Sequence, residues 1–267
     1  MAIYDCFQYF NEDHVVDLRM NILNDYVDYF VISESTKTHQ GQEKKLNFNL
    51  KNFKKFEKKI KYVVADYNLD KNFKNHTGGE SLIEQHQRNN IAIGLKKADD
   101  NDLIILSDSD EIPDLKKINE IKSTTRYTAF SQSMFMYKLN LKNLHESNWI
   151  GSKICLKKFF PGPQNLRNMK FKKYPFWRVD KLHFQIINGG WHFSFLQTPS
   201  DIVKKIKSYS HGEFNTKDNT DIEKIEKKIF ENKDIFNRGF ELKKIHIDHT
   251  FPDFILDNQT NLRDWIA

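Results

Sequence analysis

Cysteine is scarce in this sequence. Two cysteines, Cys6 and Cys155, occur among 267 residues, far apart and without the spacing of metal ligands. This usage excludes a disulfide scaffold and a cysteine-based zinc site. It is typical of a protein in a reducing compartment, so we expect a cytoplasmic location.

Long apolar runs are also missing. No stretch approaches the roughly 18 consecutive apolar residues of a membrane-spanning helix, and the N-terminus lacks the basic and apolar regions of a secretory signal. No repeat or low-complexity linker divides the chain, so we expect one domain over residues 1–267. With 39% apolar residues, including 22 phenylalanines, the chain can bury a substantial core.

Arginine is scarce relative to lysine. The net charge is +6, and the positive excess is carried by lysines scattered along the chain. Arginine is the residue that most often reads DNA bases, so its scarcity argues against a nucleic-acid partner. A solvated lysine surface explains the excess most simply. Attraction to an anionic substrate, or peripheral contact with a membrane surface, is the alternative.

The most informative stretch is a short strand that ends in carboxylates. The apolar residues Leu103 to Leu106 predict a strand buried on both faces. Asp108, Asp110 and Glu111 follow directly, and Pro113 prevents the strand from continuing. Open α/β sheets bind ligands at the carboxyl edge of their strands, so we expect these acids at a binding edge.

Asp108 and Asp110 have the chemistry of metal ligands. They stand two residues apart and can turn toward one point. Carboxylates suit Mg²⁺ or Mn²⁺, which is usually held by one or two of them plus substrate phosphates. A calcium loop is excluded, because Ile112 and Pro113 stand where Asp or Asn and Gly are required. A plain pair of acids in a polar turn remains the structural alternative.

The N-terminal part alternates strands and helices. After a strand at Ile3 to Phe10, a helix places Val15, Leu18 and Ile22 on one face and leaves Arg19 outside. The next strands are expected at Val27 to Ser33 and at Tyr62 to Ala65. Glu34 follows the first of these two, where it is either a ligand at the same sheet edge or an ordinary loop acid.

A helix is expected over Glu80 to Ala98, directly before the strand that carries the acids. Its spacing puts Arg88 on the buried side. A buried arginine needs a partner. Either Glu84, four residues earlier, is that partner, or the planar guanidinium of Arg88 holds a diphosphate or ribose.

Two stretches of the second half are candidates for the site. Asn165 to Lys181 is basic and aromatic without periodicity, which predicts a loop over the site. Gly189 to Ser194 is expected to be a turn, because glycines let the backbone come close to a ligand. Within it, Trp191 offers a flat apolar face and His192 a nitrogen ligand. A hydrogen-bonded core histidine is the alternative for His192.

Taken in order, these motifs resemble glycosyltransferase family 17, the relatives of the bisecting β-1,4-mannosyl-glycoprotein N-acetylglucosaminyltransferase. The resemblance covers nearly the whole chain. It is carried by Tyr4 to Phe7 with Asn11 and Glu12, by Val27 to Ser35, by Gln87 to Asn89, by Ser107 to Pro113 and by Gly190 to Ser194.

The resemblance implies a GT-A fold, which is an α/β fold with a mixed, mostly parallel sheet flanked by helices and a Rossmann-like nucleotide-binding half. Residues 1–125 would mainly bind the nucleotide sugar, and 126–267 would mainly form the acceptor side. The implied reaction is the inverting transfer of N-acetylglucosamine from UDP-GlcNAc to a sugar hydroxyl of a glycan acceptor. A divalent metal, Mn²⁺ or Mg²⁺, would bind at the Asp-x-Asp motif.

The resemblance also implies site residues. The metal ligands would be Asp108, Asp110 and His192, and the substrate contacts would be Glu12, Glu34, Arg88, Asp108, Ser109 and Trp191. For the catalytic base we favour Glu213, in a loop after a helix stop and a glycine. Its competitor, Glu111, lies closer to the metal, whereas a base should be separate from the metal it works opposite.

Two other functions are compatible with the same features. Phosphatases and phosphoryl transferases of the haloacid-dehalogenase type also place Asp-x-Asp after a buried strand, usually near the N-terminus rather than in mid-chain. A carbohydrate- or nucleic-acid-binding module without turnover could stack its ligand on Trp177 and Trp191. Release of UDP from UDP-sugars in the presence of Mn²⁺ separates these alternatives.

Overall fold

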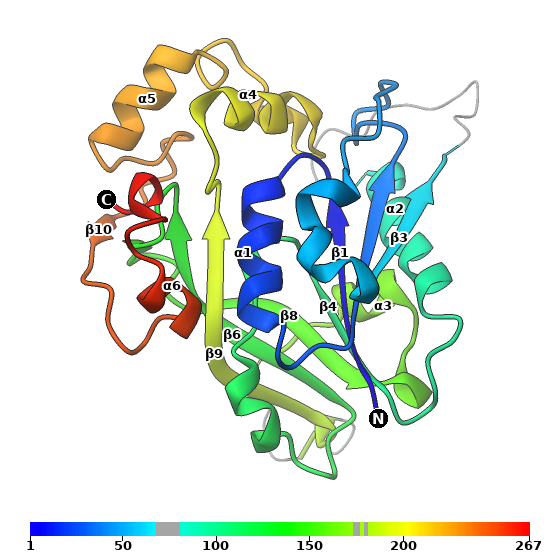
Figure 1. Ribbon diagram of the computed structural model, residues 1–267. Coiled ribbons are helices and arrows are strands. Elements are labelled where there is room, and N and C mark those ends of the chain that lie inside the picture. Colours follow the sequence, from blue (N-terminus) through cyan, green and yellow to red (C-terminus); the bar gives the residue numbers. More distant parts are fainter. Residues whose placement is uncertain (68–80, 173–176, 179–180) are drawn as a thin grey trace.

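A computed structural model of the chain describes residues 1–67, 81–172, 177–178 and 181–267 (Figure 1). Its strands are β1 (Ile3–Tyr9), β2 (Tyr29–Ser35), β3 (Ile60–Ala65), β4 (Leu103–Ser107), β5 (Glu111–Ile112), β6 (Tyr127–Met136), β7 (Leu141–Asn143), β8 (Trp149–Leu156), β9 (Phe184–Ser194) and β10 (Leu242–Lys244). The strands expected in the N-terminal part and before the acidic motif are therefore confirmed.

The α-helices are α1 (Asp13–Leu23), α2 (Leu82–Gly94), α3 (Pro163–Asn168), α4 (Pro199–Ser208), α5 (Ile222–Phe230) and α6 (Asp253–Asp257). Short 3₁₀ segments are η1 (Leu50–Lys59), η2 (Leu115–Glu120), η3 (Lys157–Phe159), η5 (Gly212–Phe214) and η6 (Arg263–Trp265). Helix α2 is shorter than the expected span: Ser81 caps it by accepting a hydrogen bond from the backbone N–H of Glu84.

The strands form one mixed sheet. Its order is β10-β7-β6-β8-β4-β1-β2-β3, and β9 joins it beside β6 and β5. Strands β4, β1, β2 and β3 run parallel, so their carboxyl ends meet at one edge. Beyond β4 the neighbours β8, β6, β7 and β10 pair antiparallel, while β9 runs parallel to β6. The predicted α/β class with a mixed sheet flanked by helices is confirmed.

Helices cover both faces of the sheet. Helices α1 and η1 lie on one face and α2 and α3 on the other, whereas α4 and α5 lie beyond the carboxyl edge (Figure 1). Successive residues of β1 serve both faces: Cys6 packs with the side of α2, and Phe7 packs with the side of α1. This burial on both faces explains why the strands read as continuous apolar runs.

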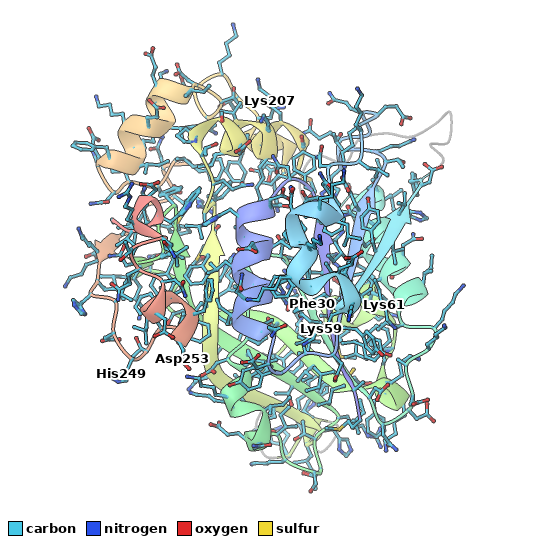
Figure 2. All side chains as sticks on the ribbon, viewed as in Figure 1. Phe30, Lys59, Lys61, Lys207, His249 and Asp253 are labelled. Carbon is cyan, nitrogen blue, oxygen red and sulfur yellow. The ribbon has the colours of Figure 1, made fainter. Side chains whose placement is uncertain are left out.

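The lysine-rich surface is visible on the outer helices. Lys204 and Lys207 of α4 and Lys224 of α5 are exposed, in contrast to core residues such as Phe30 (Figure 2). In the part of the chain that the structure describes, no helix is both long and apolar enough to cross a membrane.

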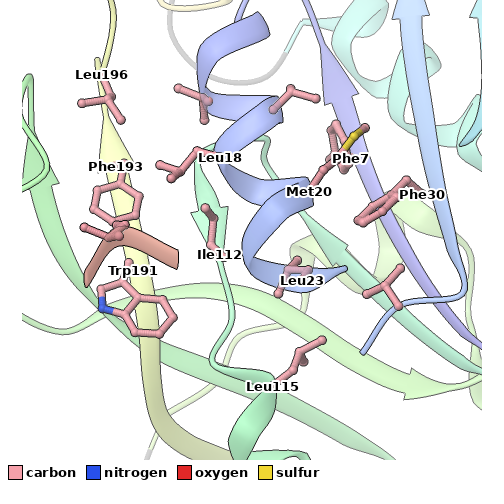
Figure 3. Close-up of a cluster of buried hydrophobic side chains, with 14 of the residues drawn as sticks. Phe7, Leu18, Met20, Leu23, Phe30, Ile112, Leu115, Trp191, Phe193 and Leu196 are labelled. Atoms are coloured by element: carbon pink, nitrogen blue, oxygen red, sulfur yellow. The ribbon is translucent and has the colours of Figure 1, made fainter. Parts of the chain in front are cut away.

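The main core lies between α1 and the sheet. Phe7, Leu18, Met20 and Phe30 meet there in a cluster that continues toward β9 (Figure 3). Arg19 belongs to the same side and is fully buried, which corrects the expectation that it points outward. Helix α1 is covered on more of its circumference than its apolar spacing indicated, and buried partners in β1 and after β4 neutralise Arg19.

The stretch Gly189 to Ser194 was expected to be a turn, and this prediction is wrong. It is the end of β9, paired with β6 and with β5. The glycines serve a register shift and a close approach of two backbones. Gly190 has a φ of +107°, and a Cβ there would lie 2.4 Å from the carbonyl oxygen of Ile112.

The expected loop over Asn165 to Lys181 also differs in its first part. Residues up to Asn168 complete α3, which begins with Pro163 at its N-terminus. A helix of six residues is too short to display a helical period in the sequence. Residues 173–176 and 179–180 lie outside the described residues.

Candidate functional site

A cavity of about 350 Å³ opens at the carboxyl edge of β1, β2 and β4. The end of β9 and helix α4 enclose it from the other side. The carboxylates of Glu12, Glu84, Asp108 and Asp110 line it together with the cationic side chains of Arg88, Arg167 and Lys205. The sheet edge predicted from the sequence therefore does carry a cavity, and this cavity is lined by both acidic and basic side chains.

Buried side chains hold the loop after β4 in place. Arg19 donates hydrogen bonds to the carbonyl oxygens of Asp108 at 3.2 Å and Glu111 at 2.6 Å. The Glu111 carboxylate accepts a bond from the backbone N–H of Asp108 at 3.0 Å, and from the indole N–H of Trp149 at 2.7 Å. Because Glu111 is fully buried and engaged in this way, it shapes the loop and does not face the cavity.

Asp108 is paired with arginines. Its Oδ2 lies 2.6 Å from Nη2 of Arg167, and its Oδ1 lies 3.7 Å from Nη2 of Arg88. Arg167 also contacts the carboxylate of Glu111 at 2.8 Å. Burial raises the pKa of Glu111, but Arg167, His192 and Trp149 together lower this pKa below its usual value. Arg167 thus bridges two carboxylates of the motif.

Asp110 faces a basic side chain on each of its oxygens. Oδ1 lies 3.5 Å from Nε2 of His192, and Oδ2 lies 3.4 Å from Nζ of Lys205. Burial raises the pKa of the Asp110 carboxyl, but Lys205 and His192 together hold this pKa well below its usual range. For His192, burial lowers the pKa of the imidazole, and Asp110 raises it above its ordinary value. Asp110 is therefore held as an ionised carboxylate between Lys205 and His192.

The donor atoms of Asp110 and His192 fit one divalent metal. Two ligands of one ion lie roughly 3 Å apart at Mn²⁺ or Mg²⁺ bond lengths, close to the 3.5 Å between Oδ1 and Nε2. Within residues 1–67, 81–172, 177–178 and 181–267, no three histidine, cysteine, aspartate or glutamate side chains gather as a metal-binding group. The pair thus suits an ion whose shell is completed by substrate phosphates.

Arg88 combines both sequence-based interpretations. Its Nη2 lies 2.7 Å from the carboxylate of Glu84, and its Nη1 donates to the amide oxygen of Gln164 at 2.7 Å. The structural partner predicted by the spacing is therefore present. Arg88 also lines the cavity and lies near Asp108, so the same guanidinium is placed to meet a ligand.

Glu12 and Ser109 lie where a substrate contact is possible. Both line the cavity. The carboxylate of Glu12 accepts hydrogen bonds from the backbone N–H groups of Phe10 at 2.9 Å and Asn11 at 3.0 Å, which orients it just before α1. The carbonyl oxygen of Ser109 accepts from Arg19 at 3.4 Å, so Ser109 is fixed together with the two aspartates.

Glu34 and Trp191 lie elsewhere. The carboxylate of Glu34 is fully buried and accepts hydrogen bonds from Lys44, from the backbone N–H groups of Asn47 and Phe48, and from the hydroxyl of Tyr62. Trp191 is 8% exposed within the main core, and its indole N–H donates to the carbonyl of Thr250 at 3.1 Å (Figure 3). Neither lines the cavity. In this structure Glu34 anchors a loop and Trp191 packs in the core, outside the cavity.

Glu213 lies on η5 beside the cavity rather than in its lining. Its carboxylate is 2.9 Å from Nδ1 of His211, and His211 does line the cavity. A carboxylate that accepts the Nδ1 proton leaves Nε2 of the ring as a base. The geometry therefore gives Glu213 an indirect position, behind an imidazole.

Sequence reasoning missed Arg167 and Lys205. Arg167 belongs to a helix too short to be recognised, and its partners come from a loop more than fifty residues earlier. Lys205 stands between Lys204 and Ile206 in a lysine-rich helix. A usable signal was its position next to the buried stripe of Ile202 and Ile206, which turns it partly inward.

The chain is similar to one protein family and, weakly, to several solved structures. The model of glycosyltransferase family 17 matches residues 1–255. No curated protein matches the chain. Among solved structures, HddC from Yersinia pseudotuberculosis is similar over 70% of this chain and 90% of its own, with 14% identity and a TM-score of 0.37. A protein described as a glucose-1-phosphate thymidylyltransferase from Bacillus anthracis, in complex with sucrose, covers 72% and 88%, with 12% identity and a TM-score of 0.38.

The two structural likenesses are too weak to support a conclusion about activity. The family match is different, because it spans nearly the whole chain and includes each element that borders the acidic motif. The chain belongs to glycosyltransferase family 17.

Proposed function

We propose that the chain is a metal-dependent, inverting glycosyltransferase that moves N-acetylglucosamine from UDP-GlcNAc to a sugar hydroxyl of a glycan acceptor, forming a β linkage. One observation supports it most directly: Asp108 and Asp110 follow the central parallel strand β4 and face a cavity that also contains Arg88 and Arg167. Nucleotide ligands bind at this edge of parallel sheets, and arginines suit a diphosphate. The donor sugar is inferred from the family resemblance.

Of the three metal ligands expected from the sequence, Asp110 and His192 are the residues that would hold Mn²⁺ or Mg²⁺, whereas Asp108 is paired with Arg167 at 2.6 Å. When bound, such a metal neutralises the leaving diphosphate as a Lewis acid. The chain supplies the rest of the electrostatic environment. Arg88 and Arg167 lie on either side of Asp108, and their planar forks can bind phosphate oxygens in the same place.

Glu12 is proposed as a contact of the donor. It lines the cavity, and its carboxylate is oriented by two backbone N–H groups. Sugar and ribose hydroxyls are donors that a fixed carboxylate can accept from. Ser109 contributes through the loop that it shares with the aspartates.

Proton removal from the acceptor is assigned to the pair of His211 and Glu213. His211 lines the cavity, and Glu213 contacts the far nitrogen of its ring. In this arrangement Nε2 of His211 takes the proton from the attacking hydroxyl, and Glu213 orients the ring and stabilises the imidazolium. The base predicted from the sequence becomes a positioning residue.

The alternatives are less compatible with the site. A phosphatase of the haloacid-dehalogenase type needs a free carboxylate nucleophile in the motif, whereas Asp108 is bound to Arg167 at 2.6 Å and Asp110 is flanked by Lys205 and His192. A stacking module needs accessible aromatic faces. Trp191 lies in the core, so only Trp177 of the two tryptophans considered is exposed.

The test is a donor panel. The protein is incubated with UDP-GlcNAc, UDP-glucose and UDP-galactose, with Mn²⁺, Mg²⁺ or EDTA, with and without a mixture of glycans, and UDP release is measured. UDP release from UDP-GlcNAc, lost with EDTA and in the Asp110→Ala variant but kept in the control Asp257→Ala, supports the proposal. Phosphate release from phosphate monoesters without UDP release would contradict it.

A further inference from the structure

Helix α4 sends one lysine into the cavity. Lys204 and Lys207 of this helix are exposed, and Lys207 is labelled on it in Figure 2. Lys205 lies between them on the other side and lines the cavity, with its side chain 20% exposed. The apolar stripe of Ile202 and Ile206 packs α4 against the end of the sheet and so fixes which way Lys205 points.

The ammonium of Lys205 lies between two carboxylates. Its Nζ is 3.4 Å from Oδ2 of Asp110 and 3.8 Å from Oε1 of Glu12, and it lies 5.4 Å from the centre of the Phe195 ring. These are acids of the cavity lining, at the point where Asp110 and His192 would hold a metal. Lys205 therefore places a positive charge on the same carboxylate that would bind the proposed cofactor.

The contact is looser than the structural ion pairs of the same molecule. Arg19 meets Asp5 at 2.5 Å, and Arg167 meets Glu111 at 2.8 Å. Charge-assisted hydrogen bonds are usually about 2.7–2.9 Å long. The Lys205–Asp110 pair, at 3.4 Å, is therefore a weak hydrogen bond in which the two charges still neutralise each other. A lysine on a flexible four-carbon stem can leave such a position by rotation of its side chain.

We propose that Lys205 is a resident cation of the acidic site, which neutralises Asp110 and Glu12 while the site lacks a nucleotide and turns to the diphosphate when metal and nucleotide enter. This inference rests on the proposed function, since it takes the ligand to be a nucleoside diphosphate with a divalent cation. Two positive groups on one carboxylate repel each other strongly in a partly dry cavity, so the metal and Lys205 compete for Asp110. A phosphate oxygen gives the displaced ammonium a new partner.

Competition of this kind couples the two ligands. Without nucleotide, a metal has to bind against the charge of Lys205, and its affinity is low. With UDP present, the ammonium is drawn onto the phosphates, and the metal binds more tightly. Because linkage is reciprocal, the metal strengthens UDP binding by the same factor.

The experiment measures binding in the absence of any acceptor. Free Mn²⁺ is followed by electron paramagnetic resonance during titration of the wild type, Lys205→Met and Lys205→Gln, each with and without UDP. UDP binding without metal is measured by calorimetry. Lys205→Arg keeps the charge, and Lys207→Met is the matched control on the exposed side of α4. Circular dichroism shows which variants are folded. If one of the two neutral variants does not fold, the other still tests the inference.

The neutral variants are expected to bind Mn²⁺ alone on the order of tenfold more tightly than the wild type, within the usual range of coupling between two sites. The strengthening by UDP shrinks accordingly, and UDP binding without metal weakens. Lys205→Arg and Lys207→Met behave as the wild type. Unchanged or weaker Mn²⁺ binding in both neutral variants overturns the inference, as does an equal effect in Lys207→Met or no Mn²⁺ binding by any variant.

The outcome is distinguishable from failure of the proposed function. If the binding shifts occur but no UDP-sugar is turned over, the role proposed for Lys205 is supported and the proposed glycosyl transfer from a UDP-sugar is wrong. If UDP-GlcNAc is turned over while the neutral variants bind Mn²⁺ as the wild type does, the enzyme stands and the role of Lys205 is wrong.

Discussion

Arg19 and Asp5 form a doubly hydrogen-bonded ion pair in the interior, with distances of 2.7 and 2.5 Å and no exposure of either side chain. The same guanidinium donates to the carbonyl oxygens of Asp108, Ser109 and Glu111. A residue of α1, backed by a residue of β1, thereby holds the loop that presents the two aspartates. This link makes the acidic loop part of the rigid core.

Variants of the Arg19–Asp5 pair should show that its effect on stability and its effect on ligand binding can be measured separately. Arg19→Met or Asp5→Leu alone leaves a buried charge without its partner, and each should lower the free energy of unfolding by about 3–5 kcal/mol in urea titrations. The double variant should recover most of that loss, because apolar residues can replace a buried ion pair. The loop carbonyls would still lack their donor, so Mn²⁺-dependent UDP binding should stay weak. A stable double variant that binds UDP as the wild type does would contradict this.

Replacement of Arg88 by lysine should weaken binding of the nucleotide sugar. Arg88→Lys keeps the charge but loses the planar fork, and we expect UDP-GlcNAc affinity to fall about tenfold, equivalent to ~1.4 kcal/mol. Arg263→Lys, at a largely exposed arginine, is the matched control. If Arg88→Lys lowers stability while the folded protein keeps its donor affinity, the pair with Glu84 is the main role of Arg88.

The proposed roles of His211 and Glu213 predict losses of turnover of different size when each residue is replaced. His211→Ala should lower turnover by roughly 10² to 10⁴, the usual contribution of a general base, while donor affinity is kept. Glu213→Gln should lower turnover less, because Glu213 acts through the ring. Glu226→Gln, at an exposed glutamate of α5, should have no effect. A larger loss in Glu213→Gln than in His211→Ala would make Glu213 itself the base.

The part of the site that the sequence predicts is local. Leu103 to Leu106 and the acids after them identify a buried strand and its binding edge, because burial on both faces and strand ends are visible within a few residues. The partner of Arg88 is also local, since Glu84 lies one helical turn away. Such features depend on spacing along one element.

The remaining residues depend on contacts between distant segments. Arg19 is buried against Asp5, 14 residues earlier, and against carbonyl oxygens that lie about ninety residues later in the chain. Arg167 and Lys205 reach the acids from helices whose position is set by packing of the whole sheet. Trp191 shows the opposite error: an aromatic beside two glycines has the pattern of a ligand contact, yet β9 buries it in the core. Local pattern does not determine which side of a strand meets the cavity.

His14 at the start of α1 carries a half-buried imidazole unrelated to the cavity. Its ring stacks on Trp265, with centres 4.1 Å apart and planes 18° apart. Its Nε2 is buried and has no hydrogen-bond partner among the described residues. Burial lowers the pKa of His14 to about 4. The imidazole is therefore neutral in the folded protein at pH 7 and resists protonation.

This shift predicts a specific loss of stability in acid. Between an unfolded pKa near 6.5 and the folded pKa of about 4, the unfolded chain binds the proton of His14 and the folded protein does not, so stability falls as the pH is lowered through this window. His14→Phe keeps a ring on Trp265 and removes the titrating nitrogen. Between pH 7 and pH 5 it should lose about 1–2 kcal/mol less unfolding free energy than the wild type. His246→Phe, at an exposed histidine, is the control. Parallel stability curves for the wild type and His14→Phe in urea titrations across this range would show that His14 does not resist protonation in the folded protein.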